Sequence, residues 1–255
     1  MKQEQHEVLS TDHVKLCVNT WPSRPSFDGG EYEQQKKQAL LAVIVHPYTR
    51  MGGSQAVTQG LAESLCLRGF NVVTFDLRGA GKSTGHASFT GEPEVGDVMA
   101  VCRWAADKYS QRILLVGSSA GAPIAGSALP HCPQVDLYVG IGYTFGIFSS
   151  LLFGSHYAPV LAWAGPKLFI MGAKDEFTTK KQLEARVAKA QGVATTAIVE
   201  GVGHFGLEGP AYDQEVAKIV GEFVAEQPHG GVGGGPAAGG AGADGEKDAA
   251  KEGSS

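Results

Sequence analysis

The sequence predicts a three-layer α/β fold, in which a mostly parallel central sheet carries helices on both faces. Apolar runs of strand length alternate with stretches of helical length along most of the chain, which is typical of successive β-α units. The run 39–45 is apolar without interruption, as expected of a central strand that is covered on both faces. Sheets of this kind bind ligands beyond the carboxyl ends of their strands, so we look for functional residues at that edge.

The expected elements are bounded by glycine, proline and polar turns. Loose alternation of apolar residues over 8–18 favours an edge strand, which is ended by prolines 22 and 25, and a polar loop or hairpin is expected over 31–37. Further strands are predicted at 39–45, 70–76, 113–118, 135–141, 167–171 and 195–199. Helices are predicted at 55–67, 94–109, 180–190 and 212–225, and from Ser119 to about residue 129.

Length and composition indicate one folded domain followed by a tail. The 255 residues, of which 43% are hydrophobic and 18% charged, are ordinary for a globular core. From Pro228 onward Gly and Ala dominate, and little could be buried. We therefore predict a domain over 1–227, with a small cap-like connection at about 143–165, and a disordered tail over 228–255.

Charge and cysteine pattern argue against several classes of partner. The net charge of -5, without a cluster of basic residues, speaks against nucleic acid. The cysteines form no C-x-x-C pair and have no histidine at metal-ligand spacing, so we expect reduced, buried thiols, no metal and no cofactor. They are Cys17, Cys66, Cys102 and Cys132. The N-terminus has no signal core, and no apolar run reaches the roughly 20 residues of a membrane helix. We expect a cytoplasmic protein without a membrane span; its oligomeric state stays open.

The stretch 113–126 is the strongest functional signal, because it predicts a buried strand that enters Gly-x-Ser-x-Gly and then a helix. This pattern places Ser119 on a tight strand-to-helix turn with its hydroxyl exposed, and it needs the small residues Gly117 and Gly121 around it. The amide of Ala120 would lie at the start of the helix, where free N–H groups can bind developing negative charge. Ser119 is therefore a candidate nucleophile.

A serine nucleophile needs a base and a carboxylate that orients it. His204 lies between glycines in a loop after a predicted strand, and Asp175 lies in the turn after another. The order Ser119, Asp175, His204 is that of elbow-type serine hydrolases. As alternatives, Asp175 could cap the following helix, His204 could be a surface residue, and Glu176 is the substitute acid.

The loop Gly79-Ala80-Gly81-Lys82-Ser83 resembles the end of a phosphate-binding loop, but the complete pattern fails. It would require glycine at position 76, where Asp76 stands, and the dinucleotide pattern G-x-G-x-x-G would require glycine in place of Thr84. We interpret this loop as a tight turn that lets the chain pass close to the elbow.

With these motifs the chain resembles the α/β-hydrolases, in particular small members with a short cap, such as the dienelactone-hydrolase and serine-aminopeptidase-like branches. The matching segments, which span about 39–225, are His46-Pro47 with Gly52-Gly53, the stretch 75–83, the Ser119 elbow, and the turns of Asp175 and His204. The resemblance implies an eight-stranded sheet whose second strand is antiparallel. It also implies an oxyanion hole formed by the amides of Ala120 and Tyr48. Dienelactone hydrolases commonly use cysteine where this chain has Ser119, which puts a lactone substrate in doubt.

The connection from Tyr143 to Gly165 is rich in apolar residues. It is either a small cap that lines an acyl or alcohol pocket or a helix packed on the sheet. Candidate pocket residues are His46, Phe145, Phe148, Leu152 and His156. His46 alternatively holds its loop, and His156 is alternatively a polar residue on the outside of this segment.

The sequence thus predicts a metal-free serine hydrolase, with Ser119, His204 and Asp175 as its triad, that acts on a small-molecule acyl substrate. Carboxylic ester hydrolysis is the expected reaction, with thioesters and activated amides as related substrates. Peptidase activity is the alternative within enzymes. A non-catalytic or slow ligand receptor, or an interaction scaffold, is the alternative outside them, because fold does not fix function.

Overall fold

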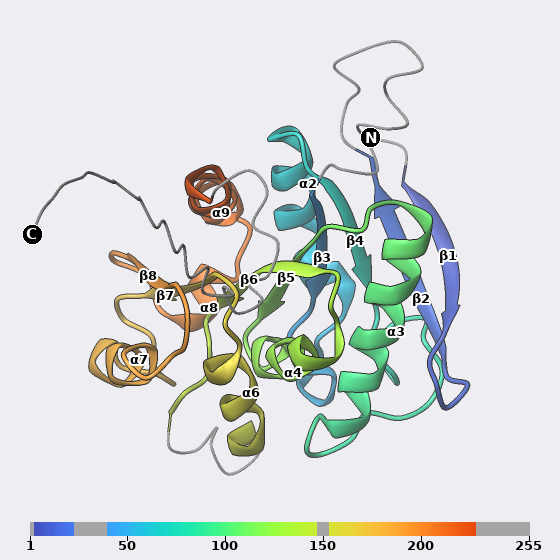
Figure 1. Ribbon diagram of the computed structural model, residues 1–255, viewed down its shortest axis with the longest axis horizontal. Helices are drawn as coiled ribbons and strands as arrows, with labels where there is room; N and C mark the ends of the chain where they lie inside the picture. Colours follow the sequence, from blue (N-terminus) through green and yellow to red (C-terminus); the bar gives the residue numbers. More distant parts are fainter. Residues whose placement is uncertain (1–2, 23–39, 147–152, 228–255) are drawn as a thin grey trace, which may run out of the picture.

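The computed structural model describes residues 3–22, 40–146 and 153–227. Within these ranges one eight-stranded sheet, of order β1-β2-β4-β3-β5-β6-β7-β8, forms the middle layer (Figure 1). The strands from β3 onward pair in parallel, whereas β2 is antiparallel to both β1 and β4. The strands are β1 Glu4–Leu9, β2 Lys15–Trp21, β3 Leu41–Val45, β4 Asn71–Phe75, β5 Ile113–Ser118, β6 Val135–Ile141, β7 Lys167–Gly172 and β8 Ala194–Val199. The predicted fold class and the antiparallel second strand are confirmed.

Helices cover both faces of the sheet. On one face α2 (Gln59–Leu67) packs beside α9 (Asp213–Glu226), and on the other α4 (Gly121–Ala128) packs between α3 (Glu92–Lys108) and α6 (Tyr157–Ala162) (Figure 1). The remaining elements are α7 Lys180–Val187, α8 His204–Leu207 and the 3-10 turns η1 Thr49–Met51, η2 Gln55–Thr58, η3 Leu129–His131 and η4 Gly154–His156. None of the described helices is both long and apolar enough to traverse a lipid bilayer.

The strand β3 shows why a continuous apolar run forms a central strand here. Leu41, Val43 and Val45 belong to the core under α3 and α4, whereas Ala42 and Ile44 belong to the core under α2 and α9. Side chains alternate between the faces of a strand, so both faces must be apolar when both are covered. Every residue of β3 and of its neighbour β5 is buried.

The N-terminal edge differs from the sequence prediction. The expected single strand over 8–18 is an antiparallel hairpin of β1 and β2, joined by a turn in which the amide of Ser10 donates to the carbonyl of Val14 over 2.9 Å. His13 takes a positive φ of 64° in this turn, which contains neither glycine nor proline. The alternation of apolar and polar residues continues through the turn, so the sequence pattern did not reveal that the strand is interrupted there. The predicted loop 31–37 and the predicted tail 228–255 lie outside the described residues.

Candidate active site

The candidate nucleophile lies on a sharp turn at the carboxyl end of β5. Ser119 has a φ of 52°, a left-handed conformation that non-glycine residues rarely adopt and that costs about 1–3 kcal/mol. A Cβ atom on Gly117 would lie 2.5 Å from the Cα of Ala122, and one on Gly121 would lie 2.1 Å from the carbonyl oxygen of His46. The two glycines of the motif are therefore required by close backbone contacts, and the strain is kept at the serine between them.

Three residues from separate loops meet at this turn. The Oγ atom of Ser119 lies 2.7 Å from Nε2 of His204, and Nδ1 of His204 lies 2.7 Å from Oδ2 of Asp175. Asp175 follows β7, and His204 begins α8 after β8, so both project from the same sheet edge as Ser119. His204 is 1% exposed, which shields these hydrogen bonds from water. The arrangement can remove the hydroxyl proton of Ser119 as it attacks an electrophile.

The neighbouring carboxylates have separate partners. The second oxygen of Asp175, Oδ1, accepts hydrogen bonds from the amides of Phe177 and Thr178 over 2.9 and 2.8 Å, so Asp175 both caps the turn and orients the imidazole. Glu176, the alternative acid, instead accepts a hydrogen bond from the backbone amide of His204 over 2.9 Å. Glu176 therefore holds the backbone at His204, while Asp175 holds its ring.

The pKa of the His204 imidazole is set by opposing effects. Burial by itself lowers the pKa of His204, because it disfavours the charged form. The hydrogen bond with Asp175 and the negative charges of Glu208, Asp175 and Glu176 raise it, and together they outweigh burial. The pKa of His204 therefore lies above its usual value, and the protonated form of the imidazole is stabilised.

The two amides expected to bind an oxyanion lie at the starts of short helical segments. Ala120 precedes α4 and Tyr48 precedes η1, and neither amide donates a hydrogen bond to another described residue. The hydroxyl of Tyr48 donates to the carbonyl of Ser88, and its ring packs edge-on against Phe153 at 5.3 Å, which anchors the loop. The contact between Gly121 and the His46 carbonyl brings this loop against the elbow.

His46 belongs to the core rather than to a substrate pocket, which corrects one expectation from the sequence. The side chain is fully buried; its Nε2 accepts from the amide of Leu77 over 3.0 Å, and its Nδ1 lies 2.5 Å from the carbonyl of Pro47. Burial lowers its pKa to about 4, so the ring is neutral and can both accept and donate. His46 thus ties the loop after β3 to the loop after β4.

Phe145 and His156 are also buried, which corrects their assignment to the pocket. Phe145 stacks on Tyr143 with ring centroids 4.0 Å apart, and His156 bonds to the Ser127 hydroxyl and the Thr90 carbonyl, each over 2.6 Å. The described part of the connection 143–165 packs through α6 on α4, in the helical layer. Apolar composition suits a core as well as a pocket, so it did not separate the two. Phe148 and Leu152 lie outside the described residues.

Two exposed aromatic residues beside His204 had no assigned role in the sequence analysis. Phe177 and Phe205 are 37% and 64% exposed, and their rings lie 4.7 and 5.4 Å from the imidazole, each roughly perpendicular to it. The only sequence signal is proximity: Phe205 follows His204, and Phe177 is two residues after Asp175. They form an apolar rim next to the base.

The glycine-rich loop after β4 is held in its turn by hydrogen bonds to Asp76. The amide of Lys82 donates to Oδ2 of Asp76 over 3.1 Å, and the hydroxyl of Ser83 donates to the carbonyl of Asp76 over 2.6 Å. Gln55 adds two further hydrogen bonds to the same carboxylate. The loop thus folds back on Asp76 through its own hydrogen bonds, in line with the tight-turn interpretation.

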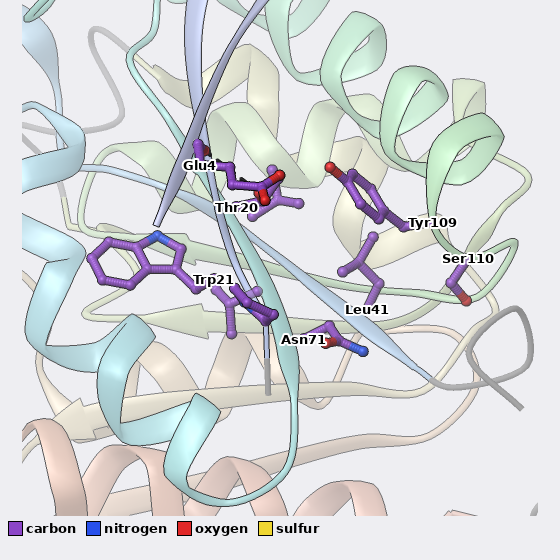
Figure 2. Close-up of a pocket in the computed structure, with 10 residues that line it drawn as sticks. Glu4, Thr20, Trp21, Leu41, Asn71, Tyr109 and Ser110 are labelled. Carbon is purple, nitrogen blue, oxygen red and sulfur yellow. Dashed lines mark hydrogen bonds between the residues drawn. The ribbon is translucent and has the colours of Figure 1, made fainter. Parts of the chain in front are cut away.

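A separate cavity of about 150 Å³ lies at the other end of the sheet, between Trp21 and Tyr109 (Figure 2). Leu41 and Asn71, the first residues of β3 and β4, line it. It therefore opens at the amino ends of the parallel strands, away from Ser119, and is not part of the candidate active site.

Comparisons with known proteins identify the family and the fold. The model of the family "serine aminopeptidase, S33" matches residues 36–170. A search of curated proteins found no match. An α/β serine hydrolase homologue from Coxiella burnetii is similar in structure, with a TM-score of 0.70, 23% identity, and coverage of 87% of this chain and 97% of that one.

Two further solved structures share the fold. A serine hydrolase without a lid from Xanthomonas campestris has a TM-score of 0.68 and 20% identity, and the match covers 88% of this chain and 94% of that one. An esterase from Pyrococcus furiosus has a TM-score of 0.68 and 20% identity, with 88% and 92% covered.

Proposed function

Because the chain belongs to the serine aminopeptidase S33 family of α/β-hydrolases, we propose that it is a serine hydrolase that cleaves a carboxylic ester or a related acyl bond. The observation that carries the proposal is the continuous hydrogen-bonded path from Ser119 through His204 to Asp175, which starts at a strained residue. Strain of this kind is concentrated at functional sites.

In the proposed reaction, Ser119 Oγ attacks the acyl carbon while His204 Nε2 takes the hydroxyl proton, and Asp175 stabilises the imidazolium. The amides of Ala120 and Tyr48 hold the oxyanion of the tetrahedral intermediate. The C–O bond to the leaving group then breaks, and His204 donates its proton to the departing oxygen. Water, activated by His204, hydrolyses the acyl-enzyme and restores Ser119.

Ester cleavage fits the surroundings better than removal of N-terminal residues from peptides. An aminopeptidase needs a negative group for the α-ammonium of its substrate. Glu176 and Glu208, the other two carboxylates that act on His204, each hold a neighbouring segment of the site: Glu176 accepts from the His204 amide and Glu208 from the Ser118 hydroxyl. The exposed Phe177 and Phe205 instead offer an apolar surface where the leaving group would depart from His204.

Covalent labelling tests the proposal without knowledge of the substrate. A fluorophosphonate probe should label the full chain, and Ser119→Ala and His204→Ala should abolish labelling. Ser64→Ala, a matched serine variant on α2, should label like wild type. Failure of the folded wild type to label would contradict the proposal and favour a non-catalytic receptor or scaffold.

Paired substrates then separate esterase from peptidase. Alkyl and benzyl esters of increasing acyl length are compared with leucine 4-nitroanilide carrying a free or an acetylated amine. We expect turnover of the esters and little of either anilide. Faster cleavage of the free-amine anilide than of every ester would assign aminopeptidase activity instead.

A further inference from the structure

A side-chain hydrogen bond joins the segment that carries the candidate base to the strand that leads to the candidate nucleophile. Glu208 follows α8, the single helical turn that begins at His204, and its amide donates to the His204 carbonyl over 3.4 Å. The Glu208 carboxylate accepts a hydrogen bond from the hydroxyl of Ser118 over 2.7 Å. Ser118 is the last residue of β5 and directly precedes Ser119. One contact thus joins two loops that are 90 residues apart in the chain.

The surroundings of Glu208 are poorly solvated. It borders a cavity of about 20 Å³, large enough for about one water molecule, together with Ser118 and Asp213. The other lining residues are mostly apolar: Val57, Thr58, Leu61, Ile141, Leu207 and Val216. Burial raises the pKa of Glu208 despite the opposing Ser118 hydrogen bond and the His204 charge, and burial raises that of Asp213 to about 6. A negative charge held in such a place acts strongly on its neighbours.

The charges that face His204 come from two loops. Asp175 bonds to the ring and Glu176 to the backbone amide, both from the turn after β7, and the charge of Glu208, which directly follows α8, also acts on the imidazole. After the hydrogen bond with Asp175, the charge of Glu208 contributes most to raising the pKa of His204. An ordinary structural glutamate would supply the contact with Ser118 but would have no effect on the imidazole.

We propose that Glu208 is a positioning residue that fastens the helix of His204 to the strand of Ser119, and that its negative charge stabilises the protonated imidazole. The inference rests on the proposed function for its kinetic consequences, since it concerns the base of that reaction. Its two parts, the contact and the charge, can be tested separately.

The charge is tested with Glu208→Gln, which keeps a hydrogen-bond acceptor for Ser118 and removes the negative charge. Neutral His204 is the base, so kcat/KM rises with pH through the pKa of this residue. Without the charge the imidazolium is less stable, and the acidic limb of the kcat/KM profile should move to lower pH by at least about 0.5 unit. Asp213→Asn, the control in the same cavity, removes a charge that does not contact Ser118 and should move the limb less than half as far.

The contact is tested with Ser118→Ala, which keeps the charge and removes the hydrogen bond. We expect kcat to fall about tenfold, as is typical when reacting groups lose alignment, with little change in KM. An unchanged acidic limb in Glu208→Gln overturns the role of the charge. A wild-type kcat in Ser118→Ala overturns the role of the contact. If Glu208→Gln does not fold, Glu208→Asp, which keeps the charge on a shorter side chain, should keep the limb and lower kcat; an unaltered kcat overturns the positioning role.

A spectroscopic readout separates this inference from the proposed function. The proton shared by His204 Nδ1 and Asp175 gives a downfield NMR signal whose titration reports the imidazole directly. It should titrate at lower pH in Glu208→Gln than in wild type even if no substrate is turned over. If the shift is present but no substrate is turned over, the proposed hydrolase function is rejected and the role of Glu208 stands. If substrate is turned over but the shift is absent, the role of Glu208 is rejected and the hydrolase function stands.

Discussion

Two networks of charged side chains lie at the carboxyl edge of the sheet, and they differ in whether a proton can be transferred within them. In one, the guanidinium of Arg78, which follows β4, donates to both oxygens of Asp97 and of Asp12. In the other, Asp175 and Ser119 flank the imidazole of His204. Arg78 is 7% exposed and Asp97 is fully buried, whereas Asp12 is half-exposed, so the first network is buried at Asp97 and reaches solvent at Asp12.

The difference shows that buried charge alone does not mark an active site. Burial by itself would lower the pKa of Arg78, but the hydrogen bonds and charges of Asp97 and Asp12 raise it overall, so this cation keeps its proton at any relevant pH. His204 instead balances burial against its carboxylates and ends at a hydroxyl on a strained backbone. The Arg78 network should therefore affect stability, and the His204 network should affect turnover.

The largest effect separating the two networks is expected from Ser119→Ala. Removal of the nucleophile should lower kcat by about 10⁵- to 10⁶-fold, because the triad acts as a unit. The free energy of unfolding should change by less than about 1 kcal/mol, since only one hydrogen bond to a partly exposed hydroxyl is lost. Ester kinetics and urea unfolding measure the two quantities. If Ser119→Ala lost as much stability as a variant of the Arg78 network, the division into a stabilising and a catalytic network would be wrong.

Asp175→Asn should have the next largest effect, a loss of about 10⁴-fold in kcat near neutral pH. The amide can still accept from the Phe177 and Thr178 amides, but it no longer stabilises the imidazolium or fixes its tautomer. Asp175 is compared with Glu176→Gln under the same conditions. A loss below about tenfold in Asp175→Asn, with a larger loss in Glu176→Gln, would make Glu176 the orienting acid.

Asp97→Ala should lower the free energy of unfolding by about 3–5 kcal/mol, because it leaves the Arg78 guanidinium buried with only Asp12 as its carboxylate partner. Activity per folded molecule should stay within about twofold of wild type. The double variant Arg78→Met/Asp97→Leu is the control, since it removes both charges and should recover most of the stability. An active-site titration with the fluorophosphonate probe counts the folded molecules. A loss of turnover per labelled site would mean that this network also serves catalysis.

The smallest effect is expected from Asp12→Asn. The hydrogen bond from Arg78 holds the pKa of Asp12 below its usual range, so the ionised form stabilises the fold. That contribution is complete above the unfolded pKa of about 4 and is lost as pH falls toward the lower folded value. Asp12 is half-exposed, so solvent screening limits the loss at pH 7 to about 0.5 kcal/mol. Unfolding at pH 7 and pH 3 measures it; an equal or larger difference at pH 3 would contradict the assignment.

The sheet and the meeting of Ser119, Asp175 and His204 could be predicted because they follow from local patterns. Apolar runs give strands, and the carboxyl ends of parallel strands converge at one edge, so turn residues after three strands come together. The wrongly expected pocket residues, such as Phe145, could not be distinguished, because packing between layers decides whether an aromatic side chain is covered. Glu208 could not be found either, because its partner Ser118 is distant in sequence and carries no motif of its own.

The backbone contacts at Gly117 and Gly121 have a consequence for redesign. Each glycine is pressed against main-chain atoms only, of Gly121 and Ala122 in one case and of Val45 and His46 in the other. The course of the chain through position 119 is thus independent of the side chain it carries there. A thiol installed by Ser119→Cys should therefore face the same imidazole as the serine hydroxyl does.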